Sequence, residues 1–265
     1  MKTELEGVAL LDALEAGIVR VAERTTDGRW VVNAWVKEAI LRIFRESPVI
    51  AAHVEGPCHA SSGESAFRDK ALLTVRRFRS EDAVRVVPGG STVRRGAHVA
   101  KNVVCMPPMY VNIGAWIGEG TMIDSHALVG SCAQIGARCH ISAAAQIGGV
   151  LEPANARPVI VEDDAFIGGN CGVYEGVLIR SRAVLASGVI LASGTVVYDL
   201  VNERELRGSR ENPLEIPTGA VVVPGARPAQ GAWAEARGLS AQCALIVKYR
   251  DEKTDRATAL EQALR

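Results

Sequence analysis

Residues 111–147 read VNIGAWIGEGTMIDSHALVGSCAQIGARCHISAAAQI, and an aliphatic residue stands at every sixth position of this stretch. The period extends in both directions, from Val87 to Val197, with one interruption at residues 153–160. A fixed six-residue period is typical of a parallel β-helix, a solenoid in which each coil packs only on its neighbours. The periodic positions are Val87, Val93, Val99, Cys105, Val111, Ile117, Ile123, Val129, Ile135, Ile141, Ile147, Val161, Ile167, Val173, Ile179, Leu185, Leu191 and Val197.

A small or β-branched residue follows most periodic positions four residues later, as at Ala97, Ala115 and Val177. We expect both residues to point into the core, because side chains alternate between faces along short strands. Glycine often stands directly after the periodic residue, where it leaves space at a bend and tolerates strained dihedral angles. Eighteen repeats, at three per coil, predict a mainly β protein of about six coils. The interruption carries Pro153 and Pro158 and leaves the period intact, so we expect a loop, a common place for substrate contacts.

Composition narrows the possible partners and the cellular compartment. The chain has 265 residues and a formal net charge of zero, which gives no indication of nucleic acid or an anionic membrane as a partner. It begins without a basic region followed by an apolar stretch, and no apolar run approaches the roughly 20 residues of a membrane span, so we expect a cytoplasmic protein. Cys105, Cys139 and Cys171 fall on inward positions, which favours reduced core thiols over disulfides or a metal site.

Both flanks of the solenoid lack its period. We divide the chain into a small, mostly helical N-terminal domain at residues 1–84, the β-helix at 85–200 and a β/α cap at 201–265. Local patterns predict a helix at 5–23, a strand-to-helix segment at 30–44 with Asn33 as the helix cap, a loop at 45–66, strands at 215–224 and 241–249, and a helix at 257–264.

Seven segments of the sequence resemble the bacterial tetrahydrodipicolinate N-succinyltransferase family, and together they cover nearly the whole chain. The resemblance implies a left-handed β-helix and a homotrimer with active sites between neighbouring subunits. It implies transfer of a succinyl or acetyl group from acyl-CoA to the amino group of tetrahydrodipicolinate, L-2-amino-6-oxopimelate or a close analogue. The segments are WVVNAWVK (30–37), RVVP (85–88), YVNIGA (110–115), EGTMID (119–124), VGSCAQIG (129–136), IGGVLEP (147–153) and CALIVK (243–248).

The same resemblance implies roles for individual residues. Arg85 would hold a carboxylate of the acceptor, since a guanidinium group can donate two parallel hydrogen bonds to it. Asp124 would bind the acceptor and remove a proton from its ammonium group, which must be deprotonated before it attacks a thioester. Ser131 is a further expected substrate contact. The acyl-CoA is expected along four small residues, Gly148, Gly149, Ala186 and Gly188, with no metal involved.

The sequence departs from the family pattern at three places. A second catalytic acid of the family is replaced by Gly172 within CGVYEG (171–176), although Glu175 stands nearby. The Thr-Trp pair after the family's aspartate is Ser125-His126, and a glycine-rich string is SAAAQIGG (142–149). These changes predict a remodelled acceptor or acyl pocket.

His126 is a candidate for the role of the missing acid. It stands two residues from Asp124, so we expect both side chains to project from one face of a strand. Imidazole is suited to act as a base near neutral pH. A packing or surface role for His126 is the alternative hypothesis.

Several functions stay open from the sequence. One class is an acyltransferase, either an enzyme of lysine biosynthesis or a diverged relative, as in tabtoxin biosynthesis, that uses acetyl-CoA. A non-catalytic assembly subunit is a second class. A metal-dependent β-helix hydratase is a third, but His98, His126 and His140 lie on different coils without a shared pattern.

Overall fold

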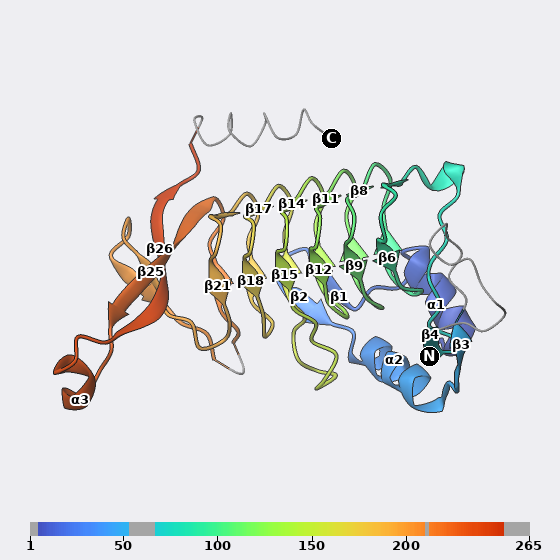
Figure 1. Cartoon of the computed structure of the whole chain (residues 1–265), viewed down its shortest axis with the longest axis horizontal. Coiled ribbons are helices and arrows are strands. Elements are labelled where there is room, and N and C mark those ends of the chain that lie inside the picture. Colours follow the sequence, from blue (N-terminus) through green and yellow to red (C-terminus); the bar gives the residue numbers. More distant parts are fainter. Residues whose placement is uncertain (1–4, 53–66, 210–211, 252–265) are drawn as a thin grey trace.

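The described part of this computed structural model, residues 5–52, 67–209 and 212–251, is a three-sided solenoid (Figure 1). The N-terminal elements lie at one end and along one side of it, and the C-terminal elements lie at the other end. The first face consists of β7 (His98–Val99), β10 (Trp116–Ile117), β13 (Gln134–Ile135), β16 (Ile160–Val161), β19 (Leu178–Ile179) and β24 (Glu215–Ile216). The second consists of β5 (Arg85–Val86), β8 (Val104–Cys105), β11 (Met122–Ile123), β14 (His140–Ile141), β17 (Phe166–Ile167), β20 (Val184–Leu185) and the start of β25 (Ala220–Pro228). The third consists of β6 (Thr92–Val93), β9 (Tyr110–Val111), β12 (Leu128–Val129), β15 (Gln146–Ile147), β18 (Gly172–Val173) and β21 (Ile190–Leu191).

Every pair of neighbouring strands on these faces is parallel, which confirms the predicted mainly β architecture. From Val93 to Val197, each periodic residue is at most 4% exposed and belongs to one continuous core. The predicted loop leaves this order intact, because Ile135 pairs with Val161 across it.

The first periodic position is an exception to the pattern. Strand β5 pairs Val86, not Val87, with Cys105, so its register is displaced by one residue and Val87 is only half-buried. Strand β5 has a neighbouring coil on one side only. Its register is therefore not fixed from both sides, as it is in the inner coils.

The glycines after periodic residues are required by close approach between coils. A Cβ on Gly130 would lie 2.2 Å from the backbone nitrogen of Gly149, and one on Gly118 would lie 2.5 Å from that of Ala137. Left-handed backbone occurs two residues later at many turns, as at Cys132 with φ 68°. We expected strained dihedral angles at these glycines. They occur instead two residues after the glycine.

The N-terminal elements are α1 (Gly7–Glu15), β1 (Ala22–Arg24), β2 (Trp30–Val32), α2 (Ala34–Glu46), β3 (Val49–Ala52), β4 (Phe67–Lys70) and the 3-10 turn η1 (Ser80–Asp82). The predicted strand-to-helix segment is confirmed, although Asn33 makes no side-chain cap and instead donates to the carbonyl of Arg20. The expected helix over 5–23 was too long. It ends at Glu15 because Gly17 is left-handed and Ile18 N–H bonds back to Ala13, a Schellman-type ending. Part of the expected loop at 45–66 forms β3, which pairs with β4, and residues 53–66 of it lie outside the described residues.

Apolar side chains and one buried acid join the N-terminal elements to the solenoid. Helices α1 and α2 form a second core with Ile113 and Cys132. The carboxylate of Glu162 is almost fully buried and accepts hydrogen bonds from Trp30 Nε1 at 2.9 Å, Arg180 Nη1 at 3.1 Å and the Ser181 backbone and hydroxyl at 3.0 Å. Desolvation alone would raise the pKa of Glu162, but these hydrogen bonds lower it below its usual value.

The C-terminal part extends the second face beyond the last coil. It contains β22 (Val197–Asp199), β23 (Arg204–Leu206), α3 (Ala232–Glu235) and β26 (Ser240–Tyr249), which forms a long antiparallel ribbon with β25 (Figure 1). The predicted strand at 241–249 is confirmed. The one predicted at 215–224 is split into β24 and β25 by a turn at Gly219, whose φ is 70°. The helix predicted at 257–264 lies outside the described residues.

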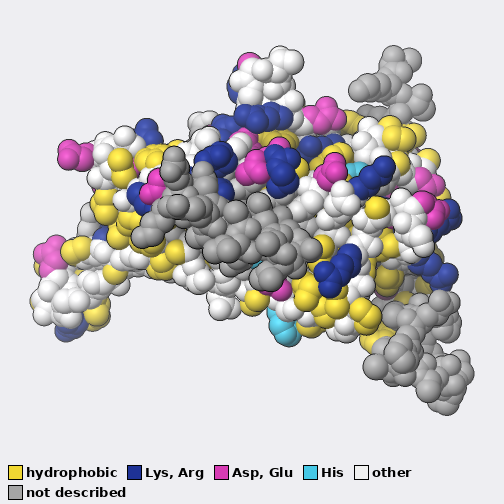
Figure 2. All heavy atoms as spheres, turned by 90° about the horizontal axis from the view of Figure 1, so that it is seen from above, with side chains coloured by type: hydrophobic (Ala, Val, Ile, Leu, Met, Phe, Trp, Pro, Cys, Tyr) yellow, Lys and Arg dark blue, Asp and Glu magenta, His cyan; other side chains and the backbone are white. Residues whose placement is uncertain are grey.

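Surface charge is mixed, and the apolar segments of the described chain are short. Acidic and basic side chains are interspersed on the face seen in Figure 2, in agreement with the zero net charge. Among the described helices, none has the length and apolar character needed to cross a membrane. The five described cysteines are free and buried, and burial raises the pKa of Cys105 and of Cys139 to about 12.

A buried aspartate organises the C-terminal part. The Asp199 carboxylate accepts hydrogen bonds from the Tyr249 hydroxyl at 2.7 Å, Asn202 Nδ2 at 2.8 Å and Arg204 Nε at 3.0 Å. Burial opposes ionisation, but these donors lower the pKa of Asp199 to about 2.

We expect the melting temperature to be constant near neutral pH and to fall below about pH 4. The folded-state pKa of Asp199 lies below its unfolded-state value near 4, so its contribution is complete above that value and is lost as pH falls toward 2. Thermal unfolding followed by circular dichroism from pH 7 to pH 2.5 measures this. Asp199→Asn should melt lower at pH 7 and depend less on pH; an equally steep acid limb in that variant would contradict the assignment.

Candidate functional site

Turns at two corners of the solenoid carry nearly all the residues that the sequence singled out. The Asp124 corner joins the second face to the third and comprises residues 124–127, 142–145, 168–171 and 186–189. The Gly148 corner joins the third face to the first at residues 130–133, 148–159 and 174–177, and residues 192–195, which lead into β22, stack next to its last turn. Each corner is built from stacked turns, so residues one coil apart in sequence lie side by side.

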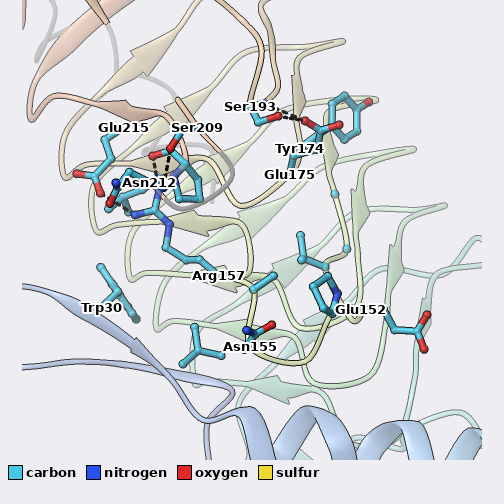
Figure 3. Close-up of a pocket in the computed structure, with 18 of the residues that line it drawn as sticks. Trp30, Glu152, Asn155, Arg157, Tyr174, Glu175, Ser193, Ser209, Asn212 and Glu215 are labelled. Atoms are coloured by element: carbon cyan, nitrogen blue, oxygen red, sulfur yellow. Dashed lines mark hydrogen bonds and ion pairs between the residues drawn. The ribbon is translucent and has the colours of Figure 1, made fainter. Parts of the chain in front are cut away.

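A groove of about 1570 Å³ lies along the Gly148 corner. It is bordered by the loop after β15, by β2 and by the segment that leads into β24. Figure 3 shows Tyr174 and Glu175 toward one end, and Arg157 with Glu215 toward the other. Gly148 and Gly149 are the two sequence-predicted residues that line it.

One wall of the groove is held by paired arginines. Arg157 donates to Glu215 Oε1 at 2.6 Å, to the carbonyl of Gly176 at 2.9 Å and to that of Pro213 at 2.8 Å. Arg180 donates to the other oxygen of Glu215 at 2.8 Å. Burial would raise the pKa of Glu215, but the two arginines lower it below its usual value. The loop is therefore fastened to the C-terminal segment, and the guanidinium group of Arg157 is already committed to these partners.

A buried lysine holds the base of the same loop. Lys37 on α2 is fully buried, and its Nζ donates to the carbonyl of Ala156 at 2.9 Å and to that of Pro153 at 3.1 Å. Desolvation lowers the pKa of Lys37. The ammonium group thus fixes the loop through backbone acceptors.

Replacing Lys37 with methionine should lower the free energy of unfolding by about 1–3 kcal/mol, because two buried carbonyls lose their donor. Thermolysin cleavage within residues 150–157 should become faster, since the loop loses its anchor. Urea denaturation and timed proteolysis measure the two effects. Lys101→Met, at an exposed turn, is the matched control, and equal behaviour of both variants would refute the anchoring role.

Tyr174 and Glu175 form the other end of the groove. Glu175 Oε2 accepts from the backbone nitrogen of Ser193 at 3.0 Å and from the Ser193 hydroxyl, which together lower the pKa of Glu175. Tyr174 is half-buried, and its ring lies close to Gly148 and Gly172. Glu175 is therefore tied to the next turn, whereas Tyr174 covers two residues that have no side chain.

Asp124 is half-buried at the start of its corner. Its Oδ1 accepts from the backbone nitrogen of Ser125 at 2.7 Å, and its Oδ2 lies 3.8 Å from Nε2 of His140 on the neighbouring strand β14. The His140 ring also meets Phe166 edge-on, with centroids 5.0 Å apart. One side of the Asp124 carboxylate thus faces solvent and the other faces an imidazole.

The structure contradicts the expected geometry of His126. Strand β11 ends at Ile123, so residues 124–127 form a turn, and alternation along a strand does not apply. His126 is exposed and left-handed, with φ 62°. It therefore shares a corner with Asp124 but does not share a strand face with it.

The remaining sequence-predicted residues are distributed over both corners and the second face. Arg85 is exposed on β5, two strands from β11, which places it roughly 10 Å along the face from the Asp124 coil. Ala186 and Gly188 lie on the Asp124 corner, and Ser131 lies on the Gly148 corner. One chain thus does not bring Arg85, Asp124 and Ser131 together in a single cavity.

Two of the predicted cofactor-binding residues, Gly148 and Gly149, must be glycine because of the way they pack. A Cβ on Gly149 would lie 2.7 Å from the backbone nitrogen of Ser131, and one on Gly148 would lie 2.7 Å from the Tyr174 ring. Gly188 is different, because a Cβ there would meet only Pro224, at 3.9 Å. Gly188 therefore has more free space beside it for a ligand than Gly148 or Gly149.

The three histidines in the described part of the chain do not converge on one point. His98 stacks on Trp116 with centroids 3.9 Å apart and bonds to the carbonyl of Glu15, whereas His140 lies on another face and His126 is at a turn. Within residues 5–52, 67–209 and 212–251, no three His, Cys, Asp or Glu side chains are grouped so that they could hold a metal ion.

Several groove residues were not predicted from the sequence, namely Trp30, Arg157, Arg180 and Glu215. They come from segments far apart in the chain, and no local pattern relates them. The replacement of an expected acid by Gly172, near the bulky Tyr174, was one of the three departures that predicted a remodelled pocket.

Comparisons with known proteins agree with this fold. Residues 8–45 match the family Tetrahydrodipicolinate N-succinyltransferase N-terminal, and residues 158–193 match Hexapeptide repeat of succinyl-transferase. The chain is 46% identical to the 2,3,4,5-tetrahydropyridine-2,6-dicarboxylate N-succinyltransferase of Nitrobacter hamburgensis, over 96% of this chain and 87% of that protein. It is 45% identical to the enzyme of the same name from Bradyrhizobium diazoefficiens, over 97% of this chain and 88% of that protein.

A solved structure gives a more distant comparison. The crystal structure of a 2,3,4,5-tetrahydropyridine-2-carboxylate N-succinyltransferase from Campylobacter jejuni matches with a TM-score of 0.55 at 16% identity. The match covers 94% of this chain and 62% of that one. It shows a shared fold.

Proposed function

Because the chain belongs to the tetrahydrodipicolinate N-succinyltransferase family, we propose that it is a CoA-dependent N-acyltransferase that succinylates tetrahydrodipicolinate or L-2-amino-6-oxopimelate. The main observation in support is that the chain is 46% identical, over 96% of its length, to a protein named 2,3,4,5-tetrahydropyridine-2,6-dicarboxylate N-succinyltransferase. The reaction would place it in lysine biosynthesis. The relatives described above support succinyl-CoA as the donor over the acetyl-CoA of a tabtoxin-type relative.

In this proposal, Asp124 accepts a proton from the acceptor's ammonium group. The freed amine nitrogen attacks the thioester carbonyl carbon, the carbon–sulfur bond breaks, and CoA leaves as the thiol after taking up a proton. Arg85 would orient the acceptor through a carboxylate. The exposed side of the Asp124 carboxylate supports this role, because a substrate can reach it.

We infer that the complete site forms between subunits of a homotrimer. The distribution of the proposed residues supports this, because Asp124 and Ser131 lie on different corners of one chain. If the Asp124 corner of one subunit faces the Gly148 corner of the next, the acceptor residues and the groove become neighbours. Gly148, Gly149, Ala186 and Gly188 would then follow the acyl-CoA along the contact.

The finer features of the fold belong to the same proposal. We infer a left-handed winding of about six coils, with the parts 1–84, 85–200 and 201–265 as separate domains. The buried free cysteines support a reducing, cytoplasmic location.

A coupled free-thiol assay tests the function. Succinyl-CoA and acetyl-CoA are offered in turn, with tetrahydrodipicolinate or L-2-aminopimelate as acceptor. We expect acceptor-dependent thiol release with succinyl-CoA. Absence of release with every pair would refute the acyltransferase proposal, and release with acetyl-CoA alone would replace the proposed donor.

His126 is the second proposed base. Its exposed position supports the idea that it reaches a substrate held against the Asp124 corner by a neighbouring subunit. We expect His126→Ala to lower turnover and to change its pH profile between pH 6 and 9. An unchanged profile would leave His126 with a surface role only.

A further inference from the structure

Tyr174 covers a position that has no side chain. Gly172 is the first residue of β18, and Tyr174 directly follows that strand. A Cβ added to Gly172 would lie 2.4 Å from Cε2 of Tyr174 and 2.9 Å from both its Cζ and its hydroxyl oxygen. Cβ atoms do not approach other heavy atoms this closely, so the tyrosine ring already occupies the volume of any side chain at position 172.

The same ring also spans the neighbouring coil. Gly148 follows β15, which pairs with β18, and a Cβ on Gly148 would lie 2.7 Å from Cδ1 of Tyr174. The ring therefore rests on two glycines, one from each of two stacked coils. Neither glycine has a left-handed φ, so both are explained by this packing together with close approach of backbone.

The hydroxyl of Tyr174 is available to a ligand. Tyr174 lines the groove and is half-buried, and no hydrogen bond joins its hydroxyl to any residue in the described part of the chain. The adjacent acid, Glu175, is engaged by Ser193. This end of the groove thus presents an uncharged group that both donates and accepts hydrogen bonds.

We propose that Tyr174 is a specificity-determining residue of the groove, whose ring excludes a side chain at position 172 and whose hydroxyl hydrogen-bonds the acyl-CoA arm. The proposal rests on the proposed acyl transfer for its ligand. The amides and the thioester carbonyl of that arm match a neutral donor and acceptor. An acid can be restored at position 172 only if Tyr174 is made smaller in the same protein.

The packing claim is that the Tyr174 ring excludes a side chain at position 172. It is tested without any ligand, by a double-mutant cycle in which the melting temperature is measured. Gly172→Ala should lower Tm by about 3–10 °C in the wild-type background, because its new methyl group collides with the ring. In the Tyr174→Val background, the same substitution should leave Tm unchanged. Equal effects in both backgrounds would overturn the packing claim.

The hydrogen bond between the Tyr174 hydroxyl and the acyl-CoA arm is tested by calorimetric titration with succinyl-CoA. Tyr174→Phe keeps the ring and removes the hydroxyl, so Kd and KM should rise by about three- to tenfold while Tm stays unchanged. Tyr198→Phe, outside the groove, is the matched control. A Kd within twofold of the wild type would overturn the contact.

The two failures are distinguishable. If the wild-type protein binds succinyl-CoA but releases no thiol with any acceptor, the proposed function fails and the Tyr174 contact is still judged by Kd. If the wild-type protein binds no acyl-CoA, the contact is overturned together with the function. The melting-temperature cycle decides the packing claim in either case.

Discussion

Asp124→Asn should lower kcat/KM for succinyl transfer by about 100- to 10,000-fold, the usual effect of losing a positioned base. The amide keeps the shape of the carboxylate and can still accept the hydrogen bond from Ser125, but it cannot take a proton from an ammonium group. The melting temperature should therefore hardly change. Thiol release at saturating succinyl-CoA, with the acceptor varied, measures the effect.

Asp164→Asn is the matched control for this experiment. Asp164 also lies in a turn of the solenoid, and its side chain is 36% exposed against 31% for Asp124. It pairs with Arg138, outside the proposed site, so the control should keep wild-type turnover. If Asp124→Asn retained more than a third of wild-type kcat/KM, Asp124 would not be the base.

Glu162→Ala should reduce the free energy of unfolding by about 3–5 kcal/mol, the range for breaking a buried ionic network. The substitution removes the acceptor shared by Trp30, Arg180 and Ser181 and leaves the guanidinium group without that partner. Since Trp30 and Arg180 also line the groove, KM for acyl-CoA should rise. Urea denaturation measures the first effect and initial rates measure the second.

Two further variants separate charge from packing at this site. Glu162→Gln keeps the volume and should lose less stability than Glu162→Ala. Glu205→Ala removes an exposed acid that pairs only with Arg207 among the described residues, and it should change the free energy of unfolding by at most about 1 kcal/mol. If Glu162→Ala behaved like Glu205→Ala, the buried network would not hold the N-terminal elements on the solenoid.

The repeat made most of the fold predictable, because the signal for each coil is local and recurs in the next. The error at Val87 is the exception, because β5 pairs with β8 one residue out of the period, a displacement that the repeat itself does not predict. The helix ending at Glu15 was missed because the predicted helix ran through Gly17, whose left-handed backbone ends the helix.

The candidate site was less predictable than the fold. Asp124 and Arg85 were identified by resemblance, but the geometry of His126 was wrong because a strand of two residues is too short for alternation to extend past it. Lys37 and Glu162 gave no signal, since a buried charge is recognisable only once its partners from distant segments are known.

The loop at residues 153–160 is inserted without any shift in strand pairing, and this has a consequence for how the protein can change. The coils before and after it keep their register across it, so the length of the loop between Glu152 and Arg157 can vary. Segments of other lengths could be grafted between these two residues with little effect on the remaining coils, provided that Lys37 keeps carbonyl acceptors and that Arg157 and the buried Val159 and Ile160 are retained. Exchange of this one loop segment could therefore change which ligand the groove prefers, while the solenoid stays the same.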